Sequence, residues 1–228
     1  MKSSIRTFGI AALSATLLGL AACSADTGET TDAGNGDGGG QDKNITLGFV
    51  PSWTDGRSMG HLLKGQLEDM GYTVTTEELG EPGPLYVALA QGDVDIYPSA
   101  WPEVTHSAYM DEYGDDIDSL GAYYDGAVLT WAVPEYSEIQ SIADIPDYAD
   151  VLDNRIIGIE PGAGLTRVST EDVIPGYGLE DFELVTSSTA AMLAELQSKI
   201  AAEEEVVVTL WRPFWANAEY NVRDLEDP

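Results

Sequence analysis

Three tryptophans each come shortly after an apolar, strand-forming run, and no other feature of the chain says more about its chemistry. They are Trp53, Trp101 and Trp211, which follow residues 45–50, 94–97 and 206–210, respectively. Open α/β sheets bind ligands beyond the carboxyl ends of their strands. The electron-rich face of an indole attracts a cation that has no N–H to donate, such as a quaternary ammonium. The trio therefore predicts an aromatic cage.

Two further features are suited to receive a carboxylate. The glycine turn at 162–164, with Leu165, opens a predicted helix whose free N–H groups favour an anion. His106 lies five residues after Trp101, where its imidazole N–H could reach the same anion. Three rings at ~0.5–2 kcal/mol each fall short of the about 8 kcal/mol that micromolar binding needs. A zwitterion, with a second charge to hold, is therefore the expected kind of ligand.

Each of these residues also has a plainer interpretation. A tryptophan taken alone equally fits a packing role, because aromatic side chains are buried mostly for their area. The glycine turn could be an ordinary strand-to-helix connection, and a single histidine is more often structural. Trp131, inside an apolar strand, and Trp215, in a predicted helix, are assigned to packing and serve as controls.

Alternating strand and helix patterns surround these residues. Strands are predicted at 45–50, 74–79, 94–97, 127–133, 155–159, 182–185 and 206–210, and helices at 58–70, 85–91, 105–113, 142–150, 164–173 and 190–203. Such alternation predicts mainly parallel sheets. We expect two βα lobes that form a hinged clamp around a small molecule. We expect lobe I at 44–131, lobe II at 132–211, and at 212–228 an incomplete return to lobe I, whose C-terminal part is truncated.

The beginning of the chain has the pattern of an export signal. Lys2 and Arg6 precede an apolar run at 8–20 that is too short for a permanent membrane span. We predict a signal peptide at 1–22, followed at 23–43 by a lipidated Cys23 and a flexible, polar linker. The predicted location is the extracytoplasmic face of the cell membrane, held by the lipid anchor. The alternative is a soluble secreted protein.

The composition and the motifs of the chain argue against several classes of function. The formal net charge of -30 argues against nucleic acid as a partner. The acidic run at 111–118 lacks the spacing of an EF-hand loop, so we expect no metal site there. No cofactor is expected. Neither a Gly-x-Ser-x-Gly elbow nor a His-Glu-x-x-His motif occurs, which leaves a secreted hydrolase as a weak alternative. A second alternative is a sensor or interaction protein of the same architecture.

Five segments of the chain resemble the glycine betaine binding lipoproteins of osmoprotectant ABC importers. They are residues 50–53, 99–106, 157–165, 187–193 and 207–213, and the resemblance extends over 44–228. It implies a type II periplasmic-binding-protein-like α/β clamp, a binding protein that is not an enzyme, and an ABC permease with a cytoplasmic ATPase as partners. It also implies a cage of Trp53, Trp101 and Trp211, with His106 and the amides of Gly164 and Leu165 on the carboxylate.

Two departures from the family pattern bear on the ligand. Residues 210–215 read Leu-Trp-Arg-Pro-Phe-Trp, where family members commonly show Gly-Trp followed by Pro-His-Trp. Asp55, two residues after Trp53, is similar to an aspartate of the related choline-binding receptors that offsets the charge of the cation. Asp55 therefore favours choline, whereas His106 and the glycine turn favour glycine betaine. We expect glycine betaine or a similar amine, with a choline or carnitine receptor, or one for both ligand types, as alternatives.

Overall fold

The structure is a computed structural model that describes residues 43–228. All of these residues belong to one compact unit of the chain. The predicted signal peptide at 1–22, the lipidated Cys23 and nearly all of the linker lie outside the described residues. Between 43 and 228, no helix is long and apolar enough to cross a membrane.

The first lobe is built on two parallel strands. Strand β1 (Asn44–Phe49) pairs with β2 (Thr73–Glu78) in parallel along its whole length. The predicted third strand at 94–97 is reduced to one parallel bridge, between Leu47 and Ile96. Leu47 and Phe49 are completely buried, so this short sheet still forms the centre of the lobe.

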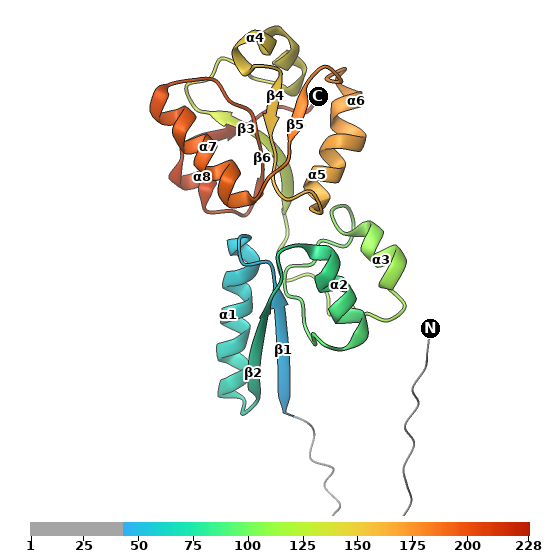
Figure 1. The fold of residues 1–228 in the computed structure, drawn as a ribbon. Coiled ribbons are helices and arrows are strands. Elements are labelled where there is room, and N and C mark those ends of the chain that lie inside the picture. Colours follow the sequence, from blue (N-terminus) through green and yellow to red (C-terminus); the bar gives the residue numbers. More distant parts are fainter. Residues whose placement is uncertain (1–42) are drawn as a thin grey trace, which may run out of the picture. The chain divides into compact units, whose positions relative to one another are not determined.

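Three helices cover this sheet. Helix α1 (Thr54–Asp69) lies on one side of β1 and β2, while α2 (Pro82–Gln91) and α3 (Ser107–Tyr113) lie on the other (Figure 1). Helix α2 starts with a proline, which suits a first turn, and ends at Gly92 in the left-handed region (φ 76°). Helix α1 begins four residues before its predicted start and so reaches the residue next to Trp53.

The second lobe contains a five-stranded sheet of mixed direction. Its order is β5-β4-β6-β3-β7, and the strands are β3 (Val128–Pro134), β4 (Arg155–Ile157), β5 (Glu183–Val185), β6 (Val208–Arg212) and β7 (Val222–Asp224). Strand β4 is parallel to β5 and β6, whereas β3 is antiparallel to β6 and β7. Strand β3 carries the chain away from the first lobe and β6 carries it back, which makes this pair antiparallel. The prediction of mainly parallel sheets therefore holds for only part of this lobe.

Helices flank this sheet on both faces. Helix α7 (Thr189–Ala202) lies on one side, and the helical segment formed by α5 (Gly164–Val168), a π-helical turn (Ser169–Val173) and α6 (Ile174–Gly176) lies on the other (Figure 1). The Ser188 hydroxyl accepts a hydrogen bond from the Ala191 N–H at 3.2 Å and so caps α7. The other helices of the described residues are a 3-10 helix (Ile142–Tyr148), α4 (Ala149–Leu152) and α8 (Ala216–Glu219).

The division between the lobes differs from the predicted one. Strand β3 lies entirely in the second sheet, so the first lobe ends near residue 127 and not at 131. Strand β7 pairs with β3, so residues 222–224 stay in the second lobe and do not return to the first. Arg212 holds this arrangement by two hydrogen bonds to the Asp224 carboxylate, at 2.6 and 3.1 Å. Below, the first lobe means 44–127 and the second 128–228.

The two tryptophans assigned to packing differ in their surroundings. Trp131 is buried on the face of the second sheet that does not carry α7, and its indole N–H donates to the Ser169 hydroxyl at 2.9 Å. Trp215 is 44% exposed and contacts the rings of Phe214 and Tyr220 at centroid distances of 5.8 and 5.5 Å. Trp131 is thus a core residue, whereas Trp215 belongs to a surface cluster.

Candidate ligand-binding site

Three different local structures position the tryptophans. Trp53 ends a turn, in which its N–H donates to the Val50 carbonyl at 3.1 Å, and it directly precedes α1. Trp101 lies in the loop at 98–106 that follows the bridge at Ile96. Trp211 lies within β6, opposite Leu129 of β3, and not beyond the end of the strand as predicted.

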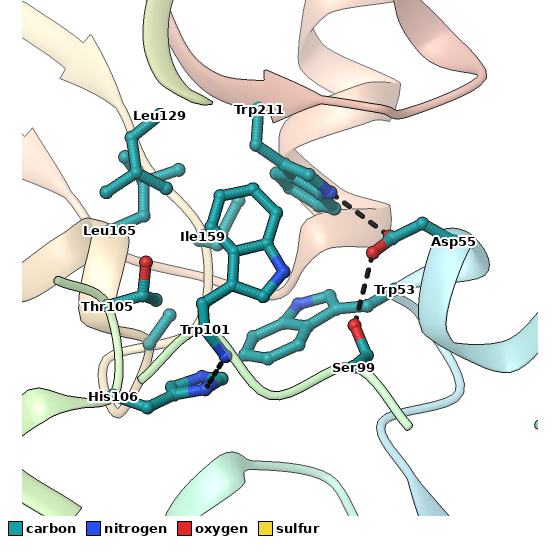
Figure 2. A pocket seen from close by; sticks show the side chains of 11 residues that line it. Trp53, Asp55, Ser99, Trp101, Thr105, His106, Leu129, Ile159, Leu165 and Trp211 are labelled. Carbon is teal, nitrogen blue, oxygen red and sulfur yellow. Dashed lines mark hydrogen bonds between the residues drawn. The ribbon is translucent and has the colours of Figure 1, made fainter. Parts of the chain in front are cut away.

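One pocket between the two lobes brings these side chains together (Figure 2). The first lobe contributes Trp53, Asp55, Ser99, Trp101, Thr105 and His106, and the second contributes Leu129, Ile159, Ala163, Leu165 and Trp211. All predicted ligand-binding residues line it except Gly164, which is buried next to it. Sequence reasoning missed the small and aliphatic members of the wall, which carry no chemical signature.

Indoles from opposite lobes meet in this pocket. The rings of Trp53 and Trp211 lie 6.3 Å apart between centroids and are inclined by 65°. Trp53 also stacks with the His106 imidazole at 6.4 Å and 15°. The indoles of Trp53 and Trp211 are at least nine-tenths buried, and that of Trp101 is half-buried. Ring faces contributed by both lobes are the arrangement that a cation would need for enclosure on closure of a clamp.

His106 has a defined protonation state. It is 1% exposed, and burial lowers its pKa to about 4. Its Nδ1 accepts a hydrogen bond from the Trp101 backbone N–H at 3.0 Å, as drawn in Figure 2. The neutral ring must then carry its proton on Nε2, and within 43–228 this atom has no hydrogen-bond partner. His106 thus brings an unpaired donor to the pocket, and a ligand oxygen would relieve that cost.

The start of α5 borders the same pocket. Gly164 and Leu165 are its first two residues, so their N–H groups have no acceptor within the helix. Leu165 lines the pocket, whereas Gly164 presses against Thr105 of the first lobe. A Cβ on Gly164 would lie 1.9 Å from the Thr105 carbonyl oxygen, so only glycine permits this approach. That these amides bind a carboxylate stays a prediction.

Asp55 places a carboxylate at the edge of the pocket. Its two oxygens accept hydrogen bonds from the Trp211 indole N–H at 3.1 Å and from the Ser99 hydroxyl at 3.3 Å. Burial raises the pKa of Asp55, and these hydrogen bonds oppose the rise. Within residues 43–228 Asp55 forms no ion pair. Its charge is therefore available to a cation between the rings.

A second buried carboxylate, Glu160, was missed by sequence reasoning. It is 6% exposed and accepts hydrogen bonds from the Trp53 indole N–H at 3.3 Å and from the Ser52 hydroxyl at 3.1 Å. Thr189 of α7 donates both its backbone N–H and its hydroxyl to it. The available signal was its place at the end of the strand predicted at 155–159.

Two more hydrogen bonds join the lobes around the pocket. The Tyr109 hydroxyl donates to the Gly162 carbonyl at 3.2 Å, and the Arg167 guanidinium donates to the Val104 carbonyl at 2.9 Å. Together with the bonds to Asp55 and Glu160, they hold the walls of the pocket in contact. Among the described residues, no group of three or more His, Cys, Asp or Glu side chains could hold a metal ion.

An α/β clamp with an aromatic, carboxylate-edged pocket between its lobes defines the class of solute-binding proteins. A family model described as the substrate binding domain of the ABC-type glycine betaine transport system matches residues 43–228. The chain belongs to this family, and its fold is that of the type II periplasmic binding proteins.

Solved structures similar to this chain include two with ligands. Lactococcal OpuAC in its closed conformation with glycine betaine is 31% identical and has a TM-score of 0.75, with 82% of this chain and 72% of that chain covered. An ABC-transporter choline binding protein in complex with choline is 27% identical and has a TM-score of 0.73, with 81% of this chain and 65% of that chain covered.

Relatives known from sequence agree with this family. The glycine betaine/carnitine transport binding protein GbuC of Listeria monocytogenes is 37% identical over 84 residues, which are 36% of this chain and 28% of the relative. The glycine betaine/proline betaine-binding periplasmic protein of Escherichia coli is 26% identical over 195 residues, 78% of this chain and 58% of the relative. The chain thus spans less than two thirds of either relative.

Proposed function

We propose that the protein captures glycine betaine or a similar quaternary ammonium zwitterion outside the cytoplasm and delivers it to an ABC permease driven by a cytoplasmic ATPase. It acts by binding and release and is not an enzyme. The observation that carries this proposal is one pocket that combines three indoles with a buried, neutral imidazole whose Nε2–H has no partner among residues 43–228.

The cationic half of the ligand would lie among the indoles. A trimethylammonium group has no N–H, so ring faces and a nearby negative charge are the means to hold it. Trp53, Trp101 and Trp211 line the pocket, and Asp55 lies at its edge without a cationic partner in the described part of the chain. Exclusion of water on closure strengthens these attractions, because the local dielectric constant falls.

The anionic half would reach His106 and the start of α5. The Nε2–H of His106 is a buried donor that needs an acceptor, and a carboxylate is a stronger acceptor than a hydroxyl. The N–H groups of Gly164 and Leu165 offer further donors at a helix start. A ligand with both charges uses both halves of the pocket, which is why a betaine is preferred here.

Choline is the second candidate, and Asp55 is the observation that favours it. Its carboxylate lines the pocket and accepts hydrogen bonds from two neutral side chains, Trp211 and Ser99. Such a charge balances a ligand that carries no anion of its own. The choline hydroxyl could accept from His106, but it would pair more weakly than a carboxylate. Carnitine, with a cation and a carboxylate further apart, is a third possibility.

Calorimetric titration with glycine betaine, proline betaine, carnitine and choline tests the proposal. We expect binding of a betaine more tightly than choline. Trp101→Ala and Trp211→Ala should abolish binding, whereas Trp131→Phe, a matched change in the core, should leave it intact. Absence of heat and of any thermal shift with all four ligands, or equal loss of binding in the Trp131 variant, would contradict the proposal.

We also propose that Cys23, after removal of residues 1–22, anchors the protein to the membrane by lipid. The sequence around Cys23 supports the anchor, and the name of the E. coli relative, a periplasmic protein, supports a location outside the cytoplasm. Expression with an alkyne-labelled fatty acid should label the membrane fraction of the wild-type protein and not of Cys23→Ser. Label in neither protein, with both found in the soluble fraction, would favour simple secretion.

A further inference from the structure

Two cage tryptophans form crossed hydrogen bonds, in which each indole N–H donates to a carboxylate of the opposite lobe. Trp53 belongs to the first lobe and donates to Glu160 of the second, at 3.3 Å. Trp211 belongs to the second lobe and donates to Asp55 of the first, at 3.1 Å. Each lobe therefore supplies one of these two rings and the carboxylate that holds the ring of the other lobe.

The carboxylate of Glu160 bridges the lobes through both of its oxygens. Oε1 accepts from the Ser52 hydroxyl of the first lobe at 3.1 Å and from the Thr189 N–H of the second at 3.0 Å. Oε2 accepts from the Trp53 indole at 3.3 Å and from the Thr189 hydroxyl at 2.8 Å. Each oxygen thus accepts one bond from each lobe.

Asp55, from the first lobe, also holds an indole of the opposite lobe, but through one oxygen only. One oxygen accepts from Trp211 across the interface, and the other accepts from Ser99 within its own lobe (Figure 2). Neither Asp55 nor Glu160 forms an ion pair within residues 43–228. A buried carboxylate, Glu160, and a half-buried one, Asp55, that accept from neutral donors are costly as structural elements, so their placement at the cage calls for a functional reason.

The crossed bonds have two effects on the cage. Each fixes the rotation of an indole about its side-chain bonds, so that its face has a set direction while the lobes are in contact. Each also polarises the ring, because an acceptor on the N–H increases the electron density of the π system. A more negative ring face attracts a cation more strongly.

We propose that Glu160 and Asp55 are reciprocal positioning residues, each holding the cage indole of the opposite lobe and thereby coupling the closed contact of the lobes to the shape of the cage. Loss of either carboxylate frees one ring and weakens the interlobe contact at the same time. The effect on ligand affinity rests on the proposed function, whereas the hydrogen bonds themselves do not.

The five tryptophans supply the probe, since each gives one indole N–H signal in a nitrogen-15 NMR spectrum, assignable through single Trp→Phe variants. In ligand-free protein, we expect the Trp53 and Trp211 signals to exchange with water more slowly than that of exposed Trp215. Glu160→Gln should move the Trp53 signal upfield and speed its exchange about tenfold, leaving Trp211 unchanged. Asp55→Asn should move the Trp211 signal upfield and speed its exchange about tenfold, leaving the Trp53 signal unchanged.

Glu195→Gln is the matched control, because Glu195 is a second-lobe carboxylate paired with Arg155 at 3.3 Å and distant in sequence from the pocket residues. It should leave both signals unchanged. The proposal is overturned if Glu160→Gln leaves the Trp53 signal unmoved, or if both indoles already exchange as fast as Trp215 in the wild-type protein. The second outcome is decisive even if the variants do not fold.

Ligand titration completes the test. Glu160→Gln and Asp55→Asn should each weaken binding of glycine betaine about tenfold, while Glu195→Gln should not. If the wild-type protein binds no quaternary amine, the proposed function fails, yet the indole signals still decide the crossed bonds. If the signals respond as expected but affinity does not change, the positioning role is refuted.

Discussion

Substitution of Gly164 by alanine tests whether contact between the lobes builds the pocket. The new Cβ would lie 1.9 Å from the Thr105 carbonyl oxygen and 2.5 Å from Thr105 Cγ2. Ordinary contact begins at 3.4 Å, so the loop at 98–106 and α5 must separate by about 1.5 Å. The carbonyl is backbone and has no rotamer to change, so the displacement passes to the adjacent His106.

A shift of this size removes His106 from hydrogen-bond reach of a ligand held by α5. The loss of one charge-assisted hydrogen bond and of part of the ring contact is roughly 1.5–3 kcal/mol. We therefore expect glycine betaine to bind Gly164→Ala about 10- to 100-fold more weakly in a calorimetric titration. Thermal unfolding of each lobe should change little, because the clash lies between the lobes.

Gly176→Ala provides the matched control. Gly176 lies in α6, has no heavy atom within 4 Å of the position that an added Cβ would take, and is remote from the pocket lining. It should bind ligand as the wild-type protein does and gain slightly in stability, since alanine suits a helix better than glycine. Wild-type affinity in Gly164→Ala would refute the inference that the closed contact forms the carboxylate side of the pocket.

The titratable side chains of the pocket, His106 and Asp55, lead to three further predictions. Burial lowers the pKa of His106 to about 4 from 6.5, so on acidification the unfolded chain takes up a proton at this residue before the folded chain does. The contribution of the neutral imidazole to the free energy of unfolding, about 3 kcal/mol in full, is present above pH 6.5 and lost as the pH falls towards 4. Denaturant unfolding of wild type and His106→Asn should therefore differ in pH slope over this window; parallel slopes would contradict the buried, neutral imidazole. The raised pKa of Asp55 contributes a slope of opposite sign, so Asp55→Asn should steepen the rise of stability with pH, whereas an unchanged slope would argue against its burial. Asp55→Asn should also weaken choline more than glycine betaine, because only choline lacks a carboxylate of its own; equal losses in titration would remove the argument for choline.

The approach of Trp53 and Trp101 to each other was predictable, because strand ends on one edge of a sheet converge. Trp53 and Trp101 follow this rule, and Trp211 deviates by lying within β6. The helix start at Gly164 was also predictable from its glycines. The strand predicted at 94–97 is wrong in extent, because the structure has a single parallel bridge there, between Leu47 and Ile96.

Long-range pairing and crossed hydrogen bonds could not be predicted. The antiparallel pairing of β3 with β6 and β7 depends on the path of the crossing segments, which leaves no trace in the pattern of any one strand. Glu160 was missed because it contacts residues 107 and 29 positions away, Trp53 and Thr189. Trp215 was assigned to packing from a helical pattern, yet α8 has only four residues and leaves it exposed.

A crystal structure of the protein with glycine betaine tests the central claim most directly. The trimethylammonium group should lie among Trp53, Trp101 and Trp211, and the carboxylate should accept a hydrogen bond from His106 Nε2 at about 2.7–3.0 Å. A ligand bound elsewhere, or one whose carboxylate points to solvent while His106 Nε2 stays unpaired, would contradict the proposed function.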